Sequence, residues 1–238
     1  MPSVPSTGPA LEATGLSRRF GMVWAVVGFD LVLRPGEGLL VAGRNGSGKS
    51  TLLRLLAGAL RADRGEVRIE GRTDRAAVLG RTALLGHAAF TYEPLTALEN
   101  LSLFARLSGR QSDRLSLMQR LEEVGLGPQA DTAVHSFSAG MHQRLALARL
   151  LLQEPAVALL DEPHSALDPE GARLVDGIVT RMRRSGVAVV LASHDLRRAT
   201  ALCDRAVLLD RGRIQWSGTA AQLLLGGGMA LASGEGAV

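Results

Sequence analysis

The chain has 238 residues, 46% of them apolar, so it can bury a substantial core and is not an intrinsically disordered protein. Its formal charge of +4 comes from scattered arginines, and only 3% of its residues are aromatic, a composition that argues against a nucleic-acid-binding protein. Cys203 is the only cysteine, which rules out an internal disulfide and predicts a buried core residue.

The first part of the chain indicates β structure. Residues 1–9 are rich in Pro and Ser and lack the regions of a signal peptide, so we expect a flexible tail. Strand-like segments follow at 11–20 and 23–33, and a third, GEVRIEG, spans 65–71. We expect these three to form an antiparallel layer. Between them, the apolar run LLVAG at 39–43 is typical of a buried parallel strand.

The middle of the chain indicates helices. Residues 96–125 have helical composition with breaks at Gly109 and Gly125, and a second helical run follows Ser138. Together they predict a helical subdomain at about residues 96–153.

The last third of the chain indicates a parallel sheet. AVALLD at 156–161 and VAVVLAS at 187–193 are two more buried-strand candidates. The apolar residues between them recur at helical spacing and form one face: Leu174, Val175, Ile178, Val179 and Met182. Strand, helix and strand in this order predict right-handed crossovers and an α/β fold. We expect the domain to cover residues 10–218 and a Gly/Ala-rich tail to cover 219–238.

No apolar run reaches the ~18–20 residues of a membrane span, so the sequence predicts a soluble domain in the cytoplasm.

The most specific motif is GRNGSGKST at residues 43–51, between a strand and a helix. Glycines let successive backbone N–H groups face phosphate oxygens, Lys49 supplies a positive charge and the Ser50 hydroxyl suits Mg²⁺. The alternative, a plain glycine turn, does not account for the lysine and serine. The motif predicts a nucleotide-phosphate site.

Acidic and histidine residues follow the predicted strands. Asp161 and Glu162 end VALLDEP, and after a phosphate loop they are candidates for holding Mg²⁺ and for polarising the attacking water. Without such a loop they would indicate only a solvated strand end. His194 follows a buried strand, where open α/β sheets bind ligands, although a lone histidine is usually a satisfied polar residue. In SALD, Asp168 precedes a proline and also predicts a helix N-cap.

A second anion site is predicted at Ser138, Ala139 and Gly140, which precede a helical run. Small residues there leave the N–H groups of the helix N-terminus accessible.

In order and spacing, these motifs resemble the ATPase domain of ABC transporters over about residues 10–218. The resemblance implies an ABC-type P-loop NTPase with a RecA-like core, an antiparallel β layer and a helical subdomain. It identifies GRNGSGKST as the Walker A loop, VALLDEP as the Walker B strand, FSAGM as the signature motif and SALD as the D-loop. The implied activity is hydrolysis of ATP with Mg²⁺ by a translocase-class enzyme, in a head-to-tail dimer of two such chains bound to integral membrane subunits.

The resemblance also implies roles for single residues. The implied ATP-binding residues are Phe20, stacked on adenine, with Gly43, Arg44, Asn45, Gly46, Ser47, Gly48, Lys49, Ser50 and Thr51. The implied metal ligands are Ser50 and Asp161, and the implied catalytic residues are Glu162 and His194. The implied D-loop residues are Ser165 and Asp168. The signature residues Ser138, Ala139 and Gly140 are implied to contact the ATP of the partner chain.

Two departures from the family pattern are visible. Ala88 occupies the position where a glutamine is usual, and an alanine side chain can neither bind Mg²⁺ nor contact the attacking water. Ala139 and Met141 replace the commoner glycine and glutamine of the signature, so its expected role rests on Ser138 and Gly140.

Several segments are similar to the ATPase subunit of the cytochrome c maturation haem exporter: GH before the loop that contains Ala88, LTALENL after it, SAG in the signature and LALARLLL downstream. Exporters of lipids, polysaccharides or drugs share parts of this pattern, and a soluble ATPase of a cofactor-assembly scaffold is a further alternative. The subunit would lie on the cytoplasmic face of the membrane. Phe90, Tyr92 and Leu95 are apolar for a connector, and we expect them either to face membrane subunits or to pack onto the core.

Overall fold

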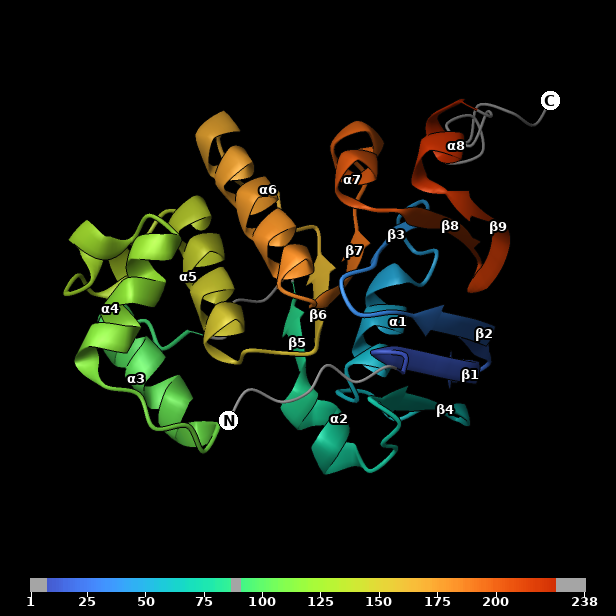
Figure 1. The fold of residues 1–238 in the computed structure, drawn as a ribbon, viewed down its shortest axis with the longest axis horizontal. Helices are drawn as coiled ribbons and strands as arrows, with labels where there is room; N and C mark the ends of the chain where they lie inside the picture. The colour runs from blue at the N-terminus through green and yellow to red at the C-terminus, as the bar shows by residue number, and fades with distance from the viewer. Residues whose placement is uncertain (1–7, 87–90, 226–238) are drawn as a thin grey trace.

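Two β-sheets and a lobe of helices make up the structure, which is a computed structural model that describes residues 8–86 and 91–225 (Figure 1). The expected flexible tail at 1–9 therefore lies almost wholly outside the described residues. The architecture is mixed α/β, as predicted, with an antiparallel layer beside a mainly parallel sheet.

The smaller sheet is antiparallel and has the strand order β2-β1-β4. β1 spans Leu11–Phe20, β2 spans Val23–Leu33 and β4 spans Arg64–Ile69. All three strands predicted for this layer are confirmed, with β4 shifted toward the N-terminus by one residue at its start.

The larger sheet has the strand order β5-β6-β7-β3-β8-β9. The three predicted strands form its centre as β3 (Gly38–Ala42), β6 (Val157–Asp161) and β7 (Ala188–Ala192), and every residue in them is buried. They are parallel to one another, whereas β9 runs antiparallel to β8 at the edge. The other strands are β5 (Thr82–Leu85), β8 (Arg205–Asp210) and β9 (Arg213–Thr219).

Alternate residues of β3 pack into two different cores on opposite faces of the sheet. Leu39 and Val41 join the core that contains the antiparallel sheet and α1, which spans Lys49–Leu56. Leu40 and Ala42 join the core on the other face, which continues into the helical lobe. Because side chains alternate along a strand, apolar residues at every position are needed where both faces are covered.

Among the described residues outside the lobe, one long helix and four shorter ones accompany the sheets. α6 covers Pro169–Arg184 and buries the predicted apolar face at Val175, Ile178, Val179 and Met182. The short helices that the sequence did not predict are α2 (Arg75–Arg81) and α7 (Leu196–Leu202).

The helices between β5 and β6 form the lobe at the left of Figure 1. Its members are α3 (Ala97–Leu107), α4 (Arg114–Glu123), α5 (Ala139–Leu152) and two 3-10 helices, Gly127–Gln129 and Val134–Ser136. Gly109 and Gly125 have φ values of 68° and 70°, so the chain leaves α3 and α4 close to the two predicted breaks.

The predicted C-terminal boundary at residue 218 is wrong. β9 continues to Thr219, and α8 follows directly at Ala220–Leu225. Leu223 is fully buried in the core shared by the helical lobe and α6, so the packed domain extends to the end of the described residues. The sequence did not predict α8 because the glycines that follow Leu225 indicate a loop.

One prediction about a single residue is confirmed. Cys203 is buried, and burial raises the pKa of its thiol to about 12. Within residues 8–86 and 91–225, no helix is long and apolar enough to cross a membrane.

The loop that leads into α3 is held by one buried amide, that of Asn100. Its Oδ1 accepts a hydrogen bond from Tyr92 N at 2.8 Å, and its Nδ2 lies within 3.2 Å of the carbonyl oxygens of Tyr92, Leu95 and Thr96. Asn100 is only 4% exposed, so water cannot replace these contacts.

We expect Asn100→Asp to lower the free energy of unfolding by about 2–3 kcal/mol, because a carboxylate would meet three carbonyl oxygens in a buried site. Urea unfolding followed by circular dichroism measures the change. The exposed Gln111 offers a matched control, and Gln111→Glu should change the stability by less than about 0.5 kcal/mol. Equal stability of both variants would show that the amide does not hold the loop.

Candidate functional site

The loop at 43–48 joins the end of β3 to the start of α1, and its two outer glycines are required by its shape. Gly43 has φ 146°, and a Cβ there would lie 2.3 Å from the carbonyl oxygen of Leu209. Gly48 has φ 108°, and its Cβ would lie 2.2 Å from the carbonyl oxygen of Ala25. Neither position has room for a side chain, so the sequence spacing of these glycines follows from the packing of the loop.

Lys49 is the first residue of α1 and the only lysine in the chain. It is 7% exposed, and its ammonium donates hydrogen bonds to the carbonyl oxygens of Gly43 at 2.7 Å and Arg44 at 3.0 Å. Burial lowers the pKa of Lys49, and the charges of Glu162 and Asp161 partly offset that effect. A buried ammonium next to a helix N-terminus forms a compact site for an anion.

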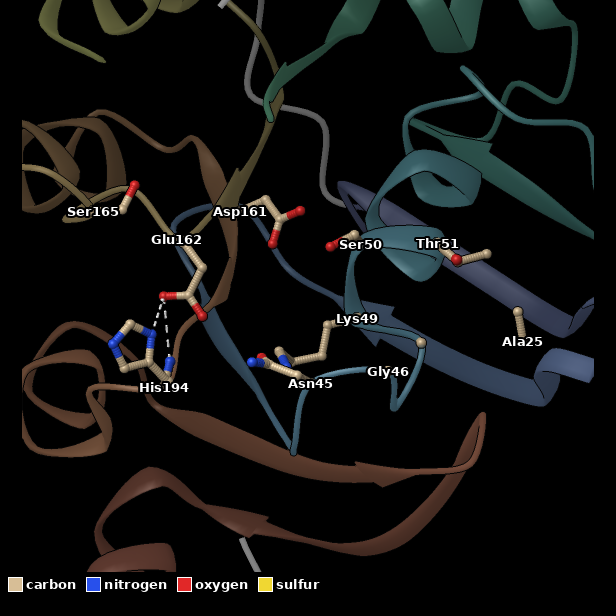
Figure 2. Close-up of a pocket in the computed structure, with 11 residues that line it drawn as sticks. Ala25, Asn45, Gly46, Lys49, Ser50, Thr51, Asp161, Glu162, Ser165 and His194 are labelled. Atoms are coloured by element: carbon tan, nitrogen blue, oxygen red, sulfur yellow. Dashed lines mark hydrogen bonds and ion pairs between the residues drawn. The ribbon is translucent and has the colours of Figure 1, made fainter. Parts of the chain in front are cut away.

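A cavity of about 510 Å³ opens beside this loop, at the carboxyl ends of the central parallel strands (Figure 2). Most of the predicted site residues are brought together there, although they come from segments far apart in the sequence. The lining residues are Ala25, Asn45, Gly46, Gly48, Lys49, Ser50, Thr51, Asp161, Glu162, Ser165 and His194. An adjoining cavity of about 400 Å³ is lined by Gly43, Arg44, Asn45, Ser193, His194 and Leu196.

Asp161, at the end of β6, and Ser50, in α1, both line the cavity with side chains that end in oxygen (Figure 2). Asp161 is 5% exposed. A carboxylate and a hydroxyl are the donors that Mg²⁺ prefers, so the residues present fit this ion. Among the described residues, no group of three or more His, Cys, Asp or Glu could hold a metal by itself, so phosphate oxygens and water would have to complete the coordination.

Glu162 leaves β6 in an unusual conformation that directs its side chain toward His194. Its φ is 50°, in the left-handed region that non-glycine residues rarely adopt, and its N–H donates to the carbonyl of Ala192 at 2.9 Å. One carboxylate oxygen lies 2.8 Å from Nδ1 of His194 (Figure 2). The carboxylate is 12% exposed and the imidazole 77% exposed, so the pair joins a buried group to an accessible one.

Ser193 supports the same pair and was not predicted. Ser193 is 1% exposed, and its hydroxyl is 3.4 Å from the carboxylate of Glu162. The hydroxyl oxygen of Ser193 also accepts a hydrogen bond from Asp195 N at 3.1 Å. Ala25 was also missed, since no sequence signal sets this small residue of β2 apart. A small polar residue directly before a histidine was the only available signal for Ser193.

The two predicted D-loop residues lie in the loop at 162–168, which runs from Glu162 to α6, and they have different surroundings. Ser165 lines the cavity. Asp168 lies outside it and caps α6, accepting a hydrogen bond from Gly171 N at 2.7 Å, so the predicted N-cap is confirmed. Asp168 also faces Arg144 of α5 at 3.6 Å.

The predicted second anion site begins α5 and does not line the cavity. Ser138 is the N-cap of this helix, and its hydroxyl accepts a hydrogen bond from Met141 N at 3.3 Å. A Cβ on Gly140 would lie 3.0 Å from the carbonyl oxygen of Ala166, so α5 touches the loop at 162–168 here. Ser138 and Ala139 are on the outside of this contact, at an exposed helix start.

Two further predicted residues, Phe20 and Ser47, have other surroundings. Phe20 ends β1, is 51% exposed and does not line the cavity; the guanidinium of Arg18 lies 5.1 Å from its ring centroid. Ser47 is 4% exposed, and its hydroxyl has no hydrogen-bond partner among the described residues.

The departure at Ala88 and the apolar residue Phe90 lie outside the described residues. Tyr92 is 57% exposed and Leu95 is half-buried, so neither is fully packed onto the core.

Comparison with known proteins agrees with this geometry. Residues 26–165, more than half of the chain, match the protein family described as ABC transporter. A solved structure described as the ATP-binding subunit of an ABC transporter superimposes with a TM-score of 0.82 and 26% identity, covering 96% of this chain and 95% of its own.

Two curated relatives with different names have similar identity to this chain. The cytochrome c biogenesis ATP-binding export protein CcmA of Xanthomonas campestris pv. campestris (strain 8004) is 39% identical over 202 residues, covering 84% of this chain and 93% of its own length. The daunorubicin resistance ATP-binding protein DrrA3 of Streptomyces coeruleorubidus is 37% identical over 219 residues, covering 90% of this chain and 69% of its own length.

The single lysine allows a direct test of the phosphate loop. An amine-reactive acetylating reagent can modify only Lys49 and the chain's amino terminus, and mass spectrometry separates the two products. At MgATP ten times its Kd, acetylation of Lys49 should slow about tenfold, because only the nucleotide-free fraction reacts. Adenosine, which lacks phosphates, should give no protection, and the amino terminus provides the internal control. Equal acetylation of Lys49 with and without MgATP would contradict the site.

Proposed function

The chain belongs to the ABC transporter family as an ATP-hydrolysing subunit, and from this premise we propose that it drives a membrane partner through MgATP-dependent closure of a dimer. The observation that carries the proposal is the convergence of Lys49, Asp161, Glu162 and His194 on one cavity beside a helix N-terminus.

Phosphate binding would fall to the loop at 43–48 and to Lys49. The N–H groups at the start of α1 attract the negative charge of the β- and γ-phosphates, and the ammonium adds a full positive charge. In the structure that ammonium is held by two carbonyl oxygens. Phosphate oxygens, which carry more charge, would compete for the same protons and draw Lys49 into the cavity.

Ser50 and Asp161 would hold Mg²⁺. When bound, the ion would neutralise part of the charge on the phosphates. These residues would also orient the nucleotide, since one oxygen comes from α1 and the other from the end of β6.

Glu162 and His194 would act on the attacking water and the γ-phosphate. The carboxylate of Glu162 is an acceptor that can orient a water molecule, and its backbone conformation holds it at the mouth of the cavity. His194 is bonded to Glu162 through Nδ1, so Nε2 is the ring nitrogen that would contact a γ-phosphate oxygen.

The signature residues Ser138, Ala139 and Gly140 would complete the site of a second chain. They begin an exposed helix and do not line the cavity of their own chain. A second copy packed head to tail would bring this helix N-terminus onto the γ-phosphate bound at Lys49. This arrangement explains why one chain contains two predicted anion sites.

We propose cytochrome c maturation, with haem export, as the transport system. Two relatives named for cytochrome c biogenesis are 39% and 38% identical to this chain, and the segments GH, LTALENL, SAG and LALARLLL support the same assignment. The similar identities keep another export system as the alternative. Pull-down from detergent-solubilised membranes with mass spectrometry identifies the partner. Recovery of a soluble assembly scaffold instead of membrane subunits would contradict the transport proposal.

The helical lobe and the loop around Tyr92 and Leu95 are the proposed contact with membrane subunits. Tyr92 presents an exposed aromatic ring next to the lobe, and the loop is held in place by Asn100. The chain would then lie peripherally on the cytoplasmic face of the membrane.

Replacing Glu162 by Gln should leave MgATP binding intact and slow hydrolysis by about a hundredfold or more, because an amide keeps the shape but cannot act as a base. ATP-bound dimers should then persist and appear in light scattering. Glu170, exposed in the first turn of α6, provides the matched control, and Glu170→Gln should hydrolyse ATP normally. A normal rate in Glu162→Gln would remove the proposed role.

The composite site is tested by mixing two defective chains. Ser138→Arg should block closure but not binding of ATP at Lys49, and Lys49→Ala should weaken binding by removing the charge that meets the phosphates. A mixed dimer contains one site with both defects and one intact site, so hydrolysis should rise above that of either variant alone. Loss of nucleotide binding by dilute monomeric Ser138→Arg would instead mean that the signature acts within its own chain.

A further inference from the structure

A row of charged and polar side chains that do not line the cavity joins the loops that carry Glu162 and His194. Nε2 of His164 lies 2.8 Å from one carboxylate oxygen of Asp176. The other oxygen of Asp176 accepts a hydrogen bond from Arg198 at 2.5 Å. Arg198 also lies 3.7 Å from Asp195, which precedes α7. We call His164, Asp176, Arg198 and Asp195 the outer bridge.

The outer bridge and the catalytic pair together form a closed ring. His164 is two residues after Glu162, and Asp195 directly follows His194, while Glu162 and His194 contact each other at 2.8 Å. Asp176 lies in the second turn of α6, a helix that is anchored in the core by Val175 and Val179. The ring therefore ties two surface loops to a rigid element at a point away from the cavity.

His164 is an unusual choice if the role is only packing. Because a carboxylate can only accept, Nε2 carries the proton, and Nδ1 is left as an acceptor. That Nδ1 is buried and has no hydrogen-bond partner among the described residues. A buried polar atom without a partner is destabilising, so an apolar side chain of similar size would serve packing better.

The loop at 162–168 also needs external support. Glu162 and Ala166 both have positive φ, at 50° and 61°, a conformation that non-glycine residues hold only when their surroundings enforce it. His164 lies between these two residues, and its side chain, 11% exposed, reaches Asp176 of α6. Losing its contact with Asp176 would release the segment between the two strained residues.

We infer that His164, Asp176 and Arg198 are positioning residues for ATP hydrolysis, which hold the Glu162 loop and the His194 loop in register through α6. None of the three lines the cavity, so they act through Glu162 and His194 and not on the nucleotide. The inference rests on the proposed roles of those two residues. It predicts an effect on the rate of hydrolysis without an effect on nucleotide affinity.

The first experiment compares variants of His164 in the full chain. His164→Leu should lower kcat about tenfold, the effect of losing one hydrogen bond to a charged group, while KM for MgATP stays the same. His164→Gln should recover most of the rate, because its terminal amide can donate to Asp176 from the position of Nε2. A wild-type kcat in His164→Leu, or an equal loss in both variants, would overturn the inference.

Neighbouring arginines on α7 provide a matched pair that does not alter the loop at 162–168. Arg198→Gln removes the contact with Asp176, whereas Arg197→Gln removes the same charge from an exposed side chain next to it. Arg198→Gln should lower kcat about tenfold and Arg197→Gln should not. Thermal unfolding of each variant identifies any that fails to fold, and equal rates for the two arginine variants would overturn the inference.

A double-mutant cycle tests whether the outer bridge acts through His194. In single-turnover assays, adding His164→Leu to His194→Ala should lower the rate by a smaller factor than His164→Leu does alone, because one of the two groups that the bridge holds in register is already absent. Additive losses would overturn the inference while leaving the role of His194 intact. A normal rate for His194→Ala alone would reject the proposed role of His194, and the inference with it.

Discussion

The site depends on the parallel pairing of β6, β7 and β3. Asp161 pairs with Ala192, and Val41 also pairs with Ala192 from the other side, so three strand ends meet along one edge of the sheet. Each strand continues directly into a functional segment: the acids after β6, the histidine after β7 and the glycine loop after β3. A shift of one residue in either pairing would reverse the faces of the side chains and separate the cavity-lining groups.

Burial on both faces of the sheet is what makes this register unique. The strands contain only apolar residues until they reach the site, where Asp161 and Ser193 are buried at 5% and 1% exposure. Polar side chains are thus confined to the strand ends, where they contact each other and a future ligand. The ammonium of Lys49 is also buried at this edge of the sheet. Burial lowers the pKa of Lys49, and the negative charges of Glu162 and Asp161 act to raise it.

The loop at 162–168 connects the parts of the molecule that would serve two different nucleotides. At one end it carries Glu162, and along its length it contacts α5 through Gln143, whose amide donates to the carbonyl of Pro163 at 3.2 Å. Gly140 and Arg144 make two further contacts between α5 and this loop. Any movement of the signature helix must therefore either carry the loop with it or break these contacts.

The sequence by itself determined the strands of both sheets that carry the site, the helical lobe and the residues of the phosphate loop. These features are local: glycines at set spacing, apolar runs of strand length and a proline after an N-cap each act through neighbouring residues. The tertiary structure alone decided the rest. The position of Phe20 outside the cavity, the burial of Leu223 in α8 and the contact of His164 with Asp176 and Arg198 depend on which elements pack together. Such contacts join residues that are distant in the chain. The sequence near a side chain therefore does not indicate which residue it contacts in the folded protein.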